Sequence, residues 1–182
     1  MSRPIRAALA TAACLTALVG GATTAHAAPA TSAASAPAAV KLQVAHSGKC
    51  LTIADGSFRN GANAEQSTCA DGLDNQVFEL APAGDGTFEV RAKHSGKCLE
   101  VRGAGTKPGD NVWQWWCGEG DHQRWRFRLV EVAKELFELR PEHAPNQCLD
   151  VYDSQTADGV NITQFNCHGG DNQRWRILPV TG

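Results

Sequence analysis

The sequence lacks several features that mark common functional classes. Its charge has no dominant sign, because 17 lysine and arginine side chains stand against 19 aspartate and glutamate side chains. Nucleic acids and anionic membranes attract strongly basic proteins, so neither is expected as a partner. The sequence also has no G-x-S-x-G, no H-E-x-x-H, no glycine-rich phosphate loop and no marked pair of carboxylates for glycoside hydrolysis. We therefore expect no enzyme, no cofactor and no metal.

The first 27 residues have the pattern of a secretory signal peptide. Arg3 and Arg6 precede an apolar run, residues 7–19, that is too short to span a bilayer as a helix. The small residues of Ala25-His26-Ala27 then form a signal-peptidase site, whereas an uncleaved membrane anchor would need a longer run. Residues 28–39 hold no bulky apolar side chain and predict a flexible leader. The protein is expected to be secreted.

From residue 40 onward the sequence repeats itself three times. HSGKCLTI at 46–53 returns as HSGKCLEV at 94–101 and as HAPNQCLDV at 143–151. Each copy closes with a related segment: DNQVF at 74–78, DHQRW at 121–125 and DNQRW at 171–175. This periodicity indicates three tandem copies of one supersecondary unit, at about 40–87, 88–136 and 137–182.

Six of the seven cysteines follow the same repeat, and the seventh, Cys14, lies in the signal peptide. Six cysteines allow fifteen pairings, of which only three respect a threefold repeat, and pairing within a copy closes the shortest loops. A zinc site is disfavoured because no C-x-x-C pair is present. We predict the disulfides Cys50–Cys69, Cys98–Cys117 and Cys148–Cys167.

The residue alternation predicts strands rather than helices. Leu99 and Val101 share one parity and Glu100 has the other, as in a strand with one buried face. The segment VEVAKELFEL at 130–139 has some helical character, but its copy in repeat two, DGTFEV, has strand chemistry. Three units of this size are too few for a propeller, so we expect them to share one core.

These motifs resemble the repeat of the ricin B-chain-type β-trefoil lectins. The resemblance rests on C-L-D-V, on an aromatic residue two positions before a second cysteine, and on N-Q-x-W, and it covers about residues 40–180. It implies an all-β fold, a β-trefoil whose six-stranded barrel is capped by three hairpins. It also implies that Trp125, Trp175 and, by substitution, Phe78 lie in the shared core, and that each repeat can carry one shallow sugar pocket.

A sugar pocket needs an aromatic ring, a carboxylate and an amide. The ring packs against the C–H face of a pyranose, while the carboxylate and amide bind its hydroxyl groups. Repeat three has all three, because Asp150, Phe165 and the pair Asn172 and Gln173 match the acid, ring and amide positions of the family. Phe165 departs from the usual Tyr or Trp. The alternative is that Asp150 is a solvated strand residue, Phe165 a half-buried core residue and Asn172 a turn former.

Repeat two has a modified set. Trp115 matches the ring position, with Trp113 on the same strand face, and the acid position holds Glu100. The amide position holds His122, followed by Gln123. A neutral imidazole still offers one donor and one acceptor, so this set predicts a sugar site with altered preference. The alternative is aromatic packing at the surface.

Repeat one has neither an acid nor a ring. Thr52 stands at the acid position and Ser67 at the ring position. Asn75 and Gln76 therefore have no aromatic ring beside them on which a sugar could stack. We expect this repeat to close the barrel.

The sequence thus predicts a secreted, non-catalytic, monomeric carbohydrate-binding protein with sites in repeats three and two. The resemblance implies galactose- or xylose-type ligands, and the sequence does not distinguish them. The alternative is a β-trefoil that binds a protein, such as a protease inhibitor, because fold alone does not fix function. The acid, ring and amide of repeat three favour a sugar.

Overall fold

The computed structural model describes residues 38–180, which form twelve β-strands and seven one-turn 3-10 helices, with no α-helix in this range. The strands are β1 (Ala38–Val44), β2 (Cys50–Ile53), β3 (Ala64–Ser67), β4 (Phe78–Gly84), β5 (Thr87–Ala92), β6 (Cys98–Val101), β7 (Val112–Trp115), β8 (Arg124–Glu131), β9 (Leu136–Pro141), β10 (Gln147–Val151), β11 (Val160–Asn166) and β12 (Trp175–Pro179). The 3-10 helices are η1 (Ala54–Gly56), η2 (Asp74–Gln76), η3 (Arg102–Ala104), η4 (Asp121–Gln123), η5 (Val132–Lys134), η6 (Tyr152–Ser154) and η7 (Asp171–Gln173). No described helix is long and apolar enough to cross a membrane.

The described range excludes the predicted signal peptide and residues 28–37. Strand β1 begins at Ala38, two residues inside the stretch whose composition predicted a leader. The sheet register explains this start, because Ala38 and Ala39 pair with Leu80 and Glu79 of β4.

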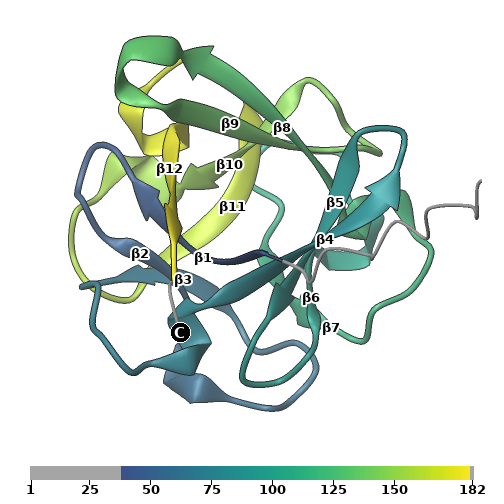
Figure 1. The fold of residues 1–182 in the computed structure, drawn as a ribbon. Coiled ribbons are helices and arrows are strands. Elements are labelled where there is room, and N and C mark those ends of the chain that lie inside the picture. The colour runs from purple at the N-terminus through teal and green to yellow at the C-terminus, as the bar shows by residue number, and fades with distance from the viewer. Residues whose placement is uncertain (1–37, 181–182) are drawn as a thin grey trace, which may run out of the picture. The chain divides into compact units, whose positions relative to one another are not determined.

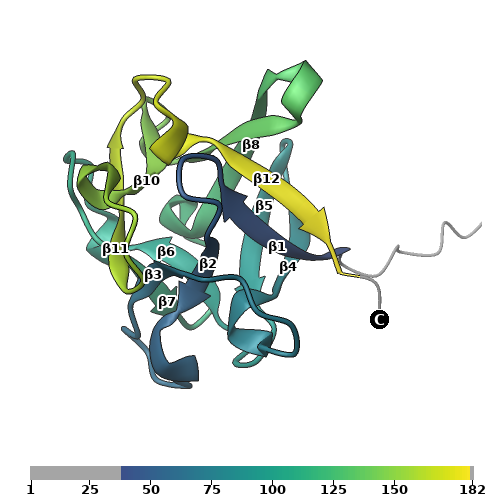
Figure 2. The same ribbon diagram turned by 90° about the vertical axis from the view of Figure 1, so that its left-hand side faces the viewer.

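Six of the strands form a closed ring of antiparallel pairs, β1–β4–β5–β8–β9–β12 and back to β1 (Figure 1). Figure 2 shows β1 and β12 side by side, so the last repeat closes the ring against the first. The other six strands form three hairpins, β2–β3, β6–β7 and β10–β11. A six-stranded barrel capped by three hairpins is a β-trefoil, which confirms the predicted fold.

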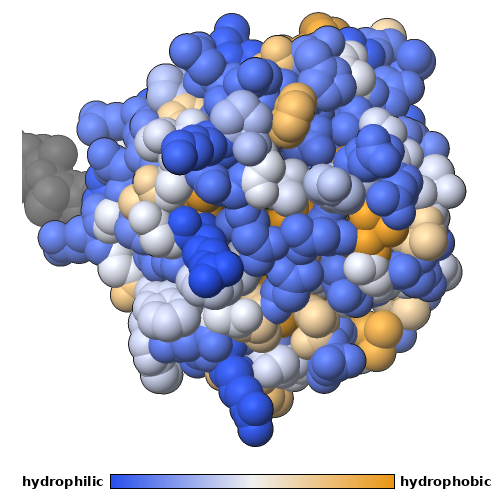
Figure 3. Space-filling model, turned by 180° about the vertical axis from the view of Figure 1, so that it is seen from behind, coloured by the Kyte–Doolittle hydropathy of each residue, from blue (hydrophilic) through white to orange (hydrophobic). Residues whose placement is uncertain are grey.

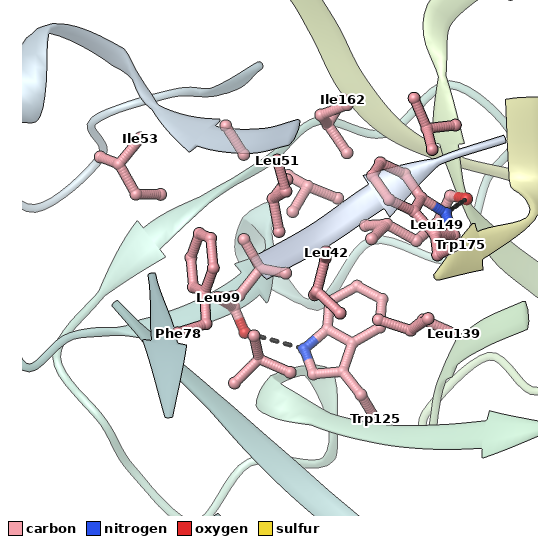
Figure 4. Close-up of a cluster of buried hydrophobic side chains, with 14 of the residues drawn as sticks. Leu42, Leu51, Ile53, Phe78, Leu99, Trp125, Leu139, Leu149, Ile162 and Trp175 are labelled. Carbon is pink, nitrogen blue, oxygen red and sulfur yellow. Dashed lines mark hydrogen bonds between the residues drawn. The ribbon is translucent and has the colours of Figure 1, made fainter. Parts of the chain in front are cut away.

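The shared core contains the three large aromatic residues that the resemblance implied. Phe78, Trp125 and Trp175 have no exposed surface. Each buried indole N–H needs an acceptor, and Figure 4 shows both bonds: Trp125 donates to the carbonyl of Leu99 and Trp175 to that of Leu149, each at 3.0 Å. Polar residues dominate the face of the molecule in Figure 3, where hydrophobic residues stand in small separate groups.

The ambiguous segment 130–139 folds as its repeat predicted. Strand β8 ends at Glu131, the single turn η5 reverses the chain, and β9 returns alongside β8 with Leu129 opposite Phe137. The helical pattern therefore covers the end of one strand, a turn and the start of the next.

Three disulfides join the predicted partners, Cys50–Cys69, Cys98–Cys117 and Cys148–Cys167, with Cα atoms 5.0 to 5.1 Å apart. Each bridge links the first strand of a hairpin to the segment just after its second strand. The disulfide prediction is confirmed.

A glutamine and a histidine of each repeat hold a loop of another repeat. Gln66 Nε2 donates to the carbonyls of Gln155 and Ala157, at 2.8 and 2.9 Å, and His46 Nε2 donates to Gln155 at 2.9 Å. The same bonds recur from Gln114 and His94 to the carbonyl of Ser57, and from Gln164 and His143 to that of Gly105. Repeat one thereby holds the loop of repeat three that follows η6.

Candidate functional site

The site in repeat three is built around Asp150 of β10, a carboxylate with 4% of its surface exposed. Two amides of η7 hold it: Asn172 Nδ2 and Gln173 Nε2 donate to Asp150 Oδ2 at 2.8 and 2.9 Å. Both side-chain donors to Asp150 from the described residues reach Oδ2. The other oxygen, Oδ1, is therefore left to accept hydrogen bonds from a ligand.

Phe165 supplies an aromatic face beside this carboxylate. It lies on β11 opposite Cys148, and 41% of its surface is exposed, so its ring is available for stacking. An open pocket of about 360 Å³ lies between these groups. Its lining residues are Gly109, Asp150, Tyr152, Asp153, Ser154, Phe165, His168 and Asn172.

Burial raises the pKa of Asp150 above the usual aspartate range. Opposing influences come from the hydrogen bonds of Gln173 and Asn172, and from the nearby His168 and His46, which favour the charged form. His168 Nε2 lies 3.8 Å from Asp150 Oδ2. The carboxylate is thus partly desolvated, which strengthens any charge-assisted hydrogen bond that a ligand makes to it.

Gln173 lies beneath the pocket. Its side chain has no exposed surface, its Nε2 also donates to the carbonyl of Asn166 at 3.0 Å, and its Oε1 accepts from the backbone N–H of His168 at 2.9 Å. The structure places it as a support for Asp150 rather than among the pocket-lining residues.

The sequence analysis missed five pocket residues: Gly109, Tyr152, Asp153, Ser154 and His168. Three of them form η6, directly after the strand that carries the acid, where Asp153 and Ser154 both have positive φ, 52° and 51°. The equivalent turns of repeats one and two also have positive φ, 55° at Asp55 and 53° at Ala104, so this left-handed conformation belongs to the repeat and does not by itself mark a site. The aromatic Tyr152 at the strand end was the available sequence signal.

The structure brings the four candidate residues of repeat two together as well. Glu100 Oε2 accepts from Gln123 Nε2 at 2.5 Å and lies 3.4 Å from His122 Nε2. Trp115 is 39% exposed on the opposite strand. In contrast to repeat three, the second carboxylate oxygen is also bound, because Trp113 Nε1 donates to Glu100 Oε1 at 2.6 Å.

Repeat one has no acid at the equivalent position, as its sequence indicated. Thr52 is buried, and its hydroxyl donates to the carbonyl of Cys50 and accepts from Gln76. Asn75 donates to the carbonyl of Ile53. These polar groups are used within the repeat.

Comparison with known families agrees with this architecture. The sequence matches the family described as ricin-type beta-trefoil lectin domain over residues 86–181, and the family described as ricin-type beta-trefoil lectin domain-like over residues 30–115. Among curated proteins, none matches the chain.

Several solved structures are similar. The designed threefold-symmetric protein ThreeFoil is 39% identical with a TM-score of 0.73, over 78% of this chain and 99% of ThreeFoil. An exo-beta-1,3-galactanase from Clostridium thermocellum is 29% identical with a TM-score of 0.73, over 79% of this chain but only 30% of the enzyme. The ricin B-like lectin of Macrolepiota procera, solved with lactose, shares the fold at 17% identity and a TM-score of 0.68, over 79% of this chain and 96% of that lectin. Together with the threefold repeat and the closed ring of strands, the family match shows that the chain belongs to the ricin-type β-trefoil lectin family.

Proposed function

We propose that this protein is a secreted, non-catalytic lectin whose repeat three binds a galactose- or xylose-type sugar. The observation that carries the proposal is the pocket beside Asp150, where an unoccupied acceptor oxygen and the exposed ring of Phe165 face the same space. A pyranose presents the complementary surfaces, a C–H face and a fringe of hydroxyl groups.

Each pocket group has a definite task in this proposal. Phe165 stacks on the C–H face, and Asp150 Oδ1 accepts one or two hydroxyl protons. Asn172 fixes the carboxylate through its amide and lines the pocket itself. Tyr152 and His168 add polar groups at the rim, where they can distinguish one sugar epimer from another.

The similar structures favour the galactose-type ligand. The Macrolepiota procera lectin was solved with lactose, and the Clostridium thermocellum enzyme is a galactanase. Each aligns with 79% of this chain. A galactose-type sugar is therefore the first ligand to test and a xylose-type sugar the second.

Isothermal titration calorimetry with lactose and with xylobiose tests the proposal. Phe165→Ala removes the stacking face and is expected to weaken binding about tenfold or more, since stacking contributes about 1 kcal/mol beyond area burial. Phe58→Ala is the matched control, because Phe58 is an exposed phenylalanine of repeat one, 67% exposed, and its removal should leave binding unchanged. Equal affinity in the Phe165 variant, or no binding of either sugar by the parent, would contradict the proposal.

Secretion and the absence of catalysis complete the proposed function. Three disulfides are typical of proteins that fold in an oxidising compartment. The pocket holds the carboxylates Asp150 and Asp153, of which Asp150 is held in place by two amides as an acceptor. Pure protein incubated with galactan or xylan should release no reducing sugar, and release by the parent but not by an Asp150 variant would show an enzyme instead.

A further inference from the structure

We infer that Trp113 fills the sugar site of repeat two in the place of a ligand, and so restricts each chain to one sugar site. The inference rests on the proposed function, because it takes the pocket of repeat three as the pattern of a working site. It departs from the sequence analysis, which placed Trp113 on the strand face of Trp115 in a predicted sugar site of repeat two.

The register of the hairpins shows where Trp113 stands. It lies on β7 directly opposite Glu100, as Thr163 of β11 lies directly opposite Asp150. Thr163 is small and buried, and the pocket beside Asp150 stays open. A tryptophan at the same position must place a large flat ring beside the acid of repeat two.

That ring contacts the counterparts of the residues that line the pocket of repeat three. Trp113 stacks on Trp115, the counterpart of Phe165, with ring centroids 5.4 Å apart and planes 20° apart. The guanidinium of Arg102, the counterpart of Tyr152, lies 5.2 Å from the Trp113 ring.

The two glycines at equivalent positions give the clearest contrast. Gly61 of repeat one faces the site of repeat two, and a Cβ added there would lie 3.5 Å from Cε3 and Cζ3 of Trp113. Gly109 of repeat two lines the pocket of repeat three, and a Cβ added there would have no atom of residues 38–180 within 4 Å. The space that is open beside Gly109 is therefore filled beside Gly61, by the Trp113 ring and by the edge of Trp115, whose Cζ3 would lie 3.7 Å from the added Cβ.

Trp113 also provides the interactions that a sugar would provide. Its face covers the platform ring, as the C–H face of a pyranose would, and its N–H donates to Glu100 Oε1 at 2.6 Å, as a hydroxyl would. The other oxygen of Glu100 is bound to Gln123, so both acceptor oxygens are used within the protein. A ligand would have to break the indole bond and displace the ring before it could stack.

The experiment replaces Trp113 in a protein whose sugar site in repeat three has been inactivated. In the background Asp150→Asn, the substitution Trp113→Thr copies repeat three at this position and should restore lactose binding in calorimetry. Trp116→Thr is the matched control, because Trp116 is the next exposed tryptophan but lies over Lys97, with the ammonium 3.7 Å from its ring. The control should stay without binding.

Glu100 is longer than aspartate and His122 replaces an asparagine, so a second variant adds Glu100→Asp and His122→Asn to Trp113→Thr. If neither variant regains binding while the disulfides and the thermal unfolding match the parent, the inference is overturned. In the protein with Asp150 intact, the number of lactose sites should rise from one to two per chain on removal of Trp113. Two sites in the parent would overturn the inference as well.

These outcomes separate the inference from the proposed function. A parent that binds one sugar, with a Trp113 variant that still binds one, contradicts the inference alone. A parent that binds neither lactose nor xylobiose, with a Trp113 variant that does bind, contradicts the proposed site in repeat three and the count of one site per chain, but supports the blocking of repeat two by Trp113. Failure of both proteins with both sugars contradicts both.

Discussion

Replacing Asp150 with asparagine tests the chemistry of the pocket without removing its framework. The oxygen of the new amide can accept from Asn172 and Gln173, as Oδ2 of the carboxylate does. Its NH₂ group then takes the place of Oδ1 and faces the pocket. The substitution therefore turns an acceptor for sugar hydroxyls into a donor while the support below it persists.

The expected loss of affinity follows from the number of bonds involved. One hydrogen bond to a charged group contributes about 1.5–3 kcal/mol, so the loss of one bond from Oδ1 weakens lactose binding about 10- to 150-fold. The free energy of unfolding at neutral pH should stay within about 1 kcal/mol of the parent, because the two amide bonds remain and a partly desolvated charge is removed. Calorimetry and thermal unfolding measure the two quantities.

The pH dependence provides a second check on the same residue. Because burial raises the pKa of Asp150, the carboxylate is protonated at a higher pH than an ordinary aspartate, and sugar affinity should fall as the pH drops through that raised value. The contribution of this group to stability runs in the opposite direction. It is fully present below the ordinary aspartate pKa, about 3.9, and is lost as the pH rises through the raised pKa of the folded state.

The asparagine variant should lose both of these pH dependences. Unchanged lactose affinity in this variant would refute the assignment of Asp150 as the acceptor. Affinity in the parent that is constant from pH 7 to pH 3 would refute it as well. A variant that unfolds at room temperature would show instead that the carboxylate is needed for the fold.

Three further predictions concern the framework around the pocket. Trp175→Ala should lower the free energy of unfolding by about 3–5 kcal/mol, because it leaves a cavity in the core and leaves the Leu149 carbonyl without its donor. Denaturant titration measures this loss, and a loss below about 1 kcal/mol would contradict the core assignment. Replacing Cys148 and Cys167 with serine should cost about 3 kcal/mol, since the bridge closes a loop of 19 residues, and an unchanged melting temperature would show that the bridge adds nothing. Gln66→Ala should weaken lactose binding although Gln66 lies in repeat one, because it holds the loop after η6; full affinity with reduced stability would show that the loop keeps its position without this residue.

The threefold repeat predicted three β units around one shared core, and the resemblance to the ricin B-chain-type lectins supplied the β-trefoil arrangement of those units. Equal offsets between cysteines gave the disulfides, and the period-two alternation around Leu99 gave the hairpin strands. The segment 130–139 was predicted correctly only because its copy in repeat two lacks the helical pattern. A single repeat would have left that segment ambiguous.

The site was predicted less completely, because spacing does not determine where a side chain turns. The sequence placed Trp113 on the face that Trp115 shares, but it did not show that the indole stacks on Trp115 and donates to Glu100. Gln173 and Asn172 are neighbours in the sequence, yet only Asn172 lines the pocket. His168 was missed because its approach to Asp150 depends on the turn after the last disulfide.

Repeat one has no acid and no aromatic ring at the site positions, yet its Gln66 and His46 bind the loop after η6 in repeat three. The loop that follows the pocket turn is fastened to repeat one, and Gly109 on the pocket wall comes from repeat two. A shortened protein that kept only the last third of the chain would carry Asp150 and Phe165 but would lack Gly109 and the bonds that hold the loop after η6. The shape of this pocket therefore depends on the closed threefold ring, because Gln66 of repeat one holds the loop of repeat three even though repeat one has no acid at the position of Asp150.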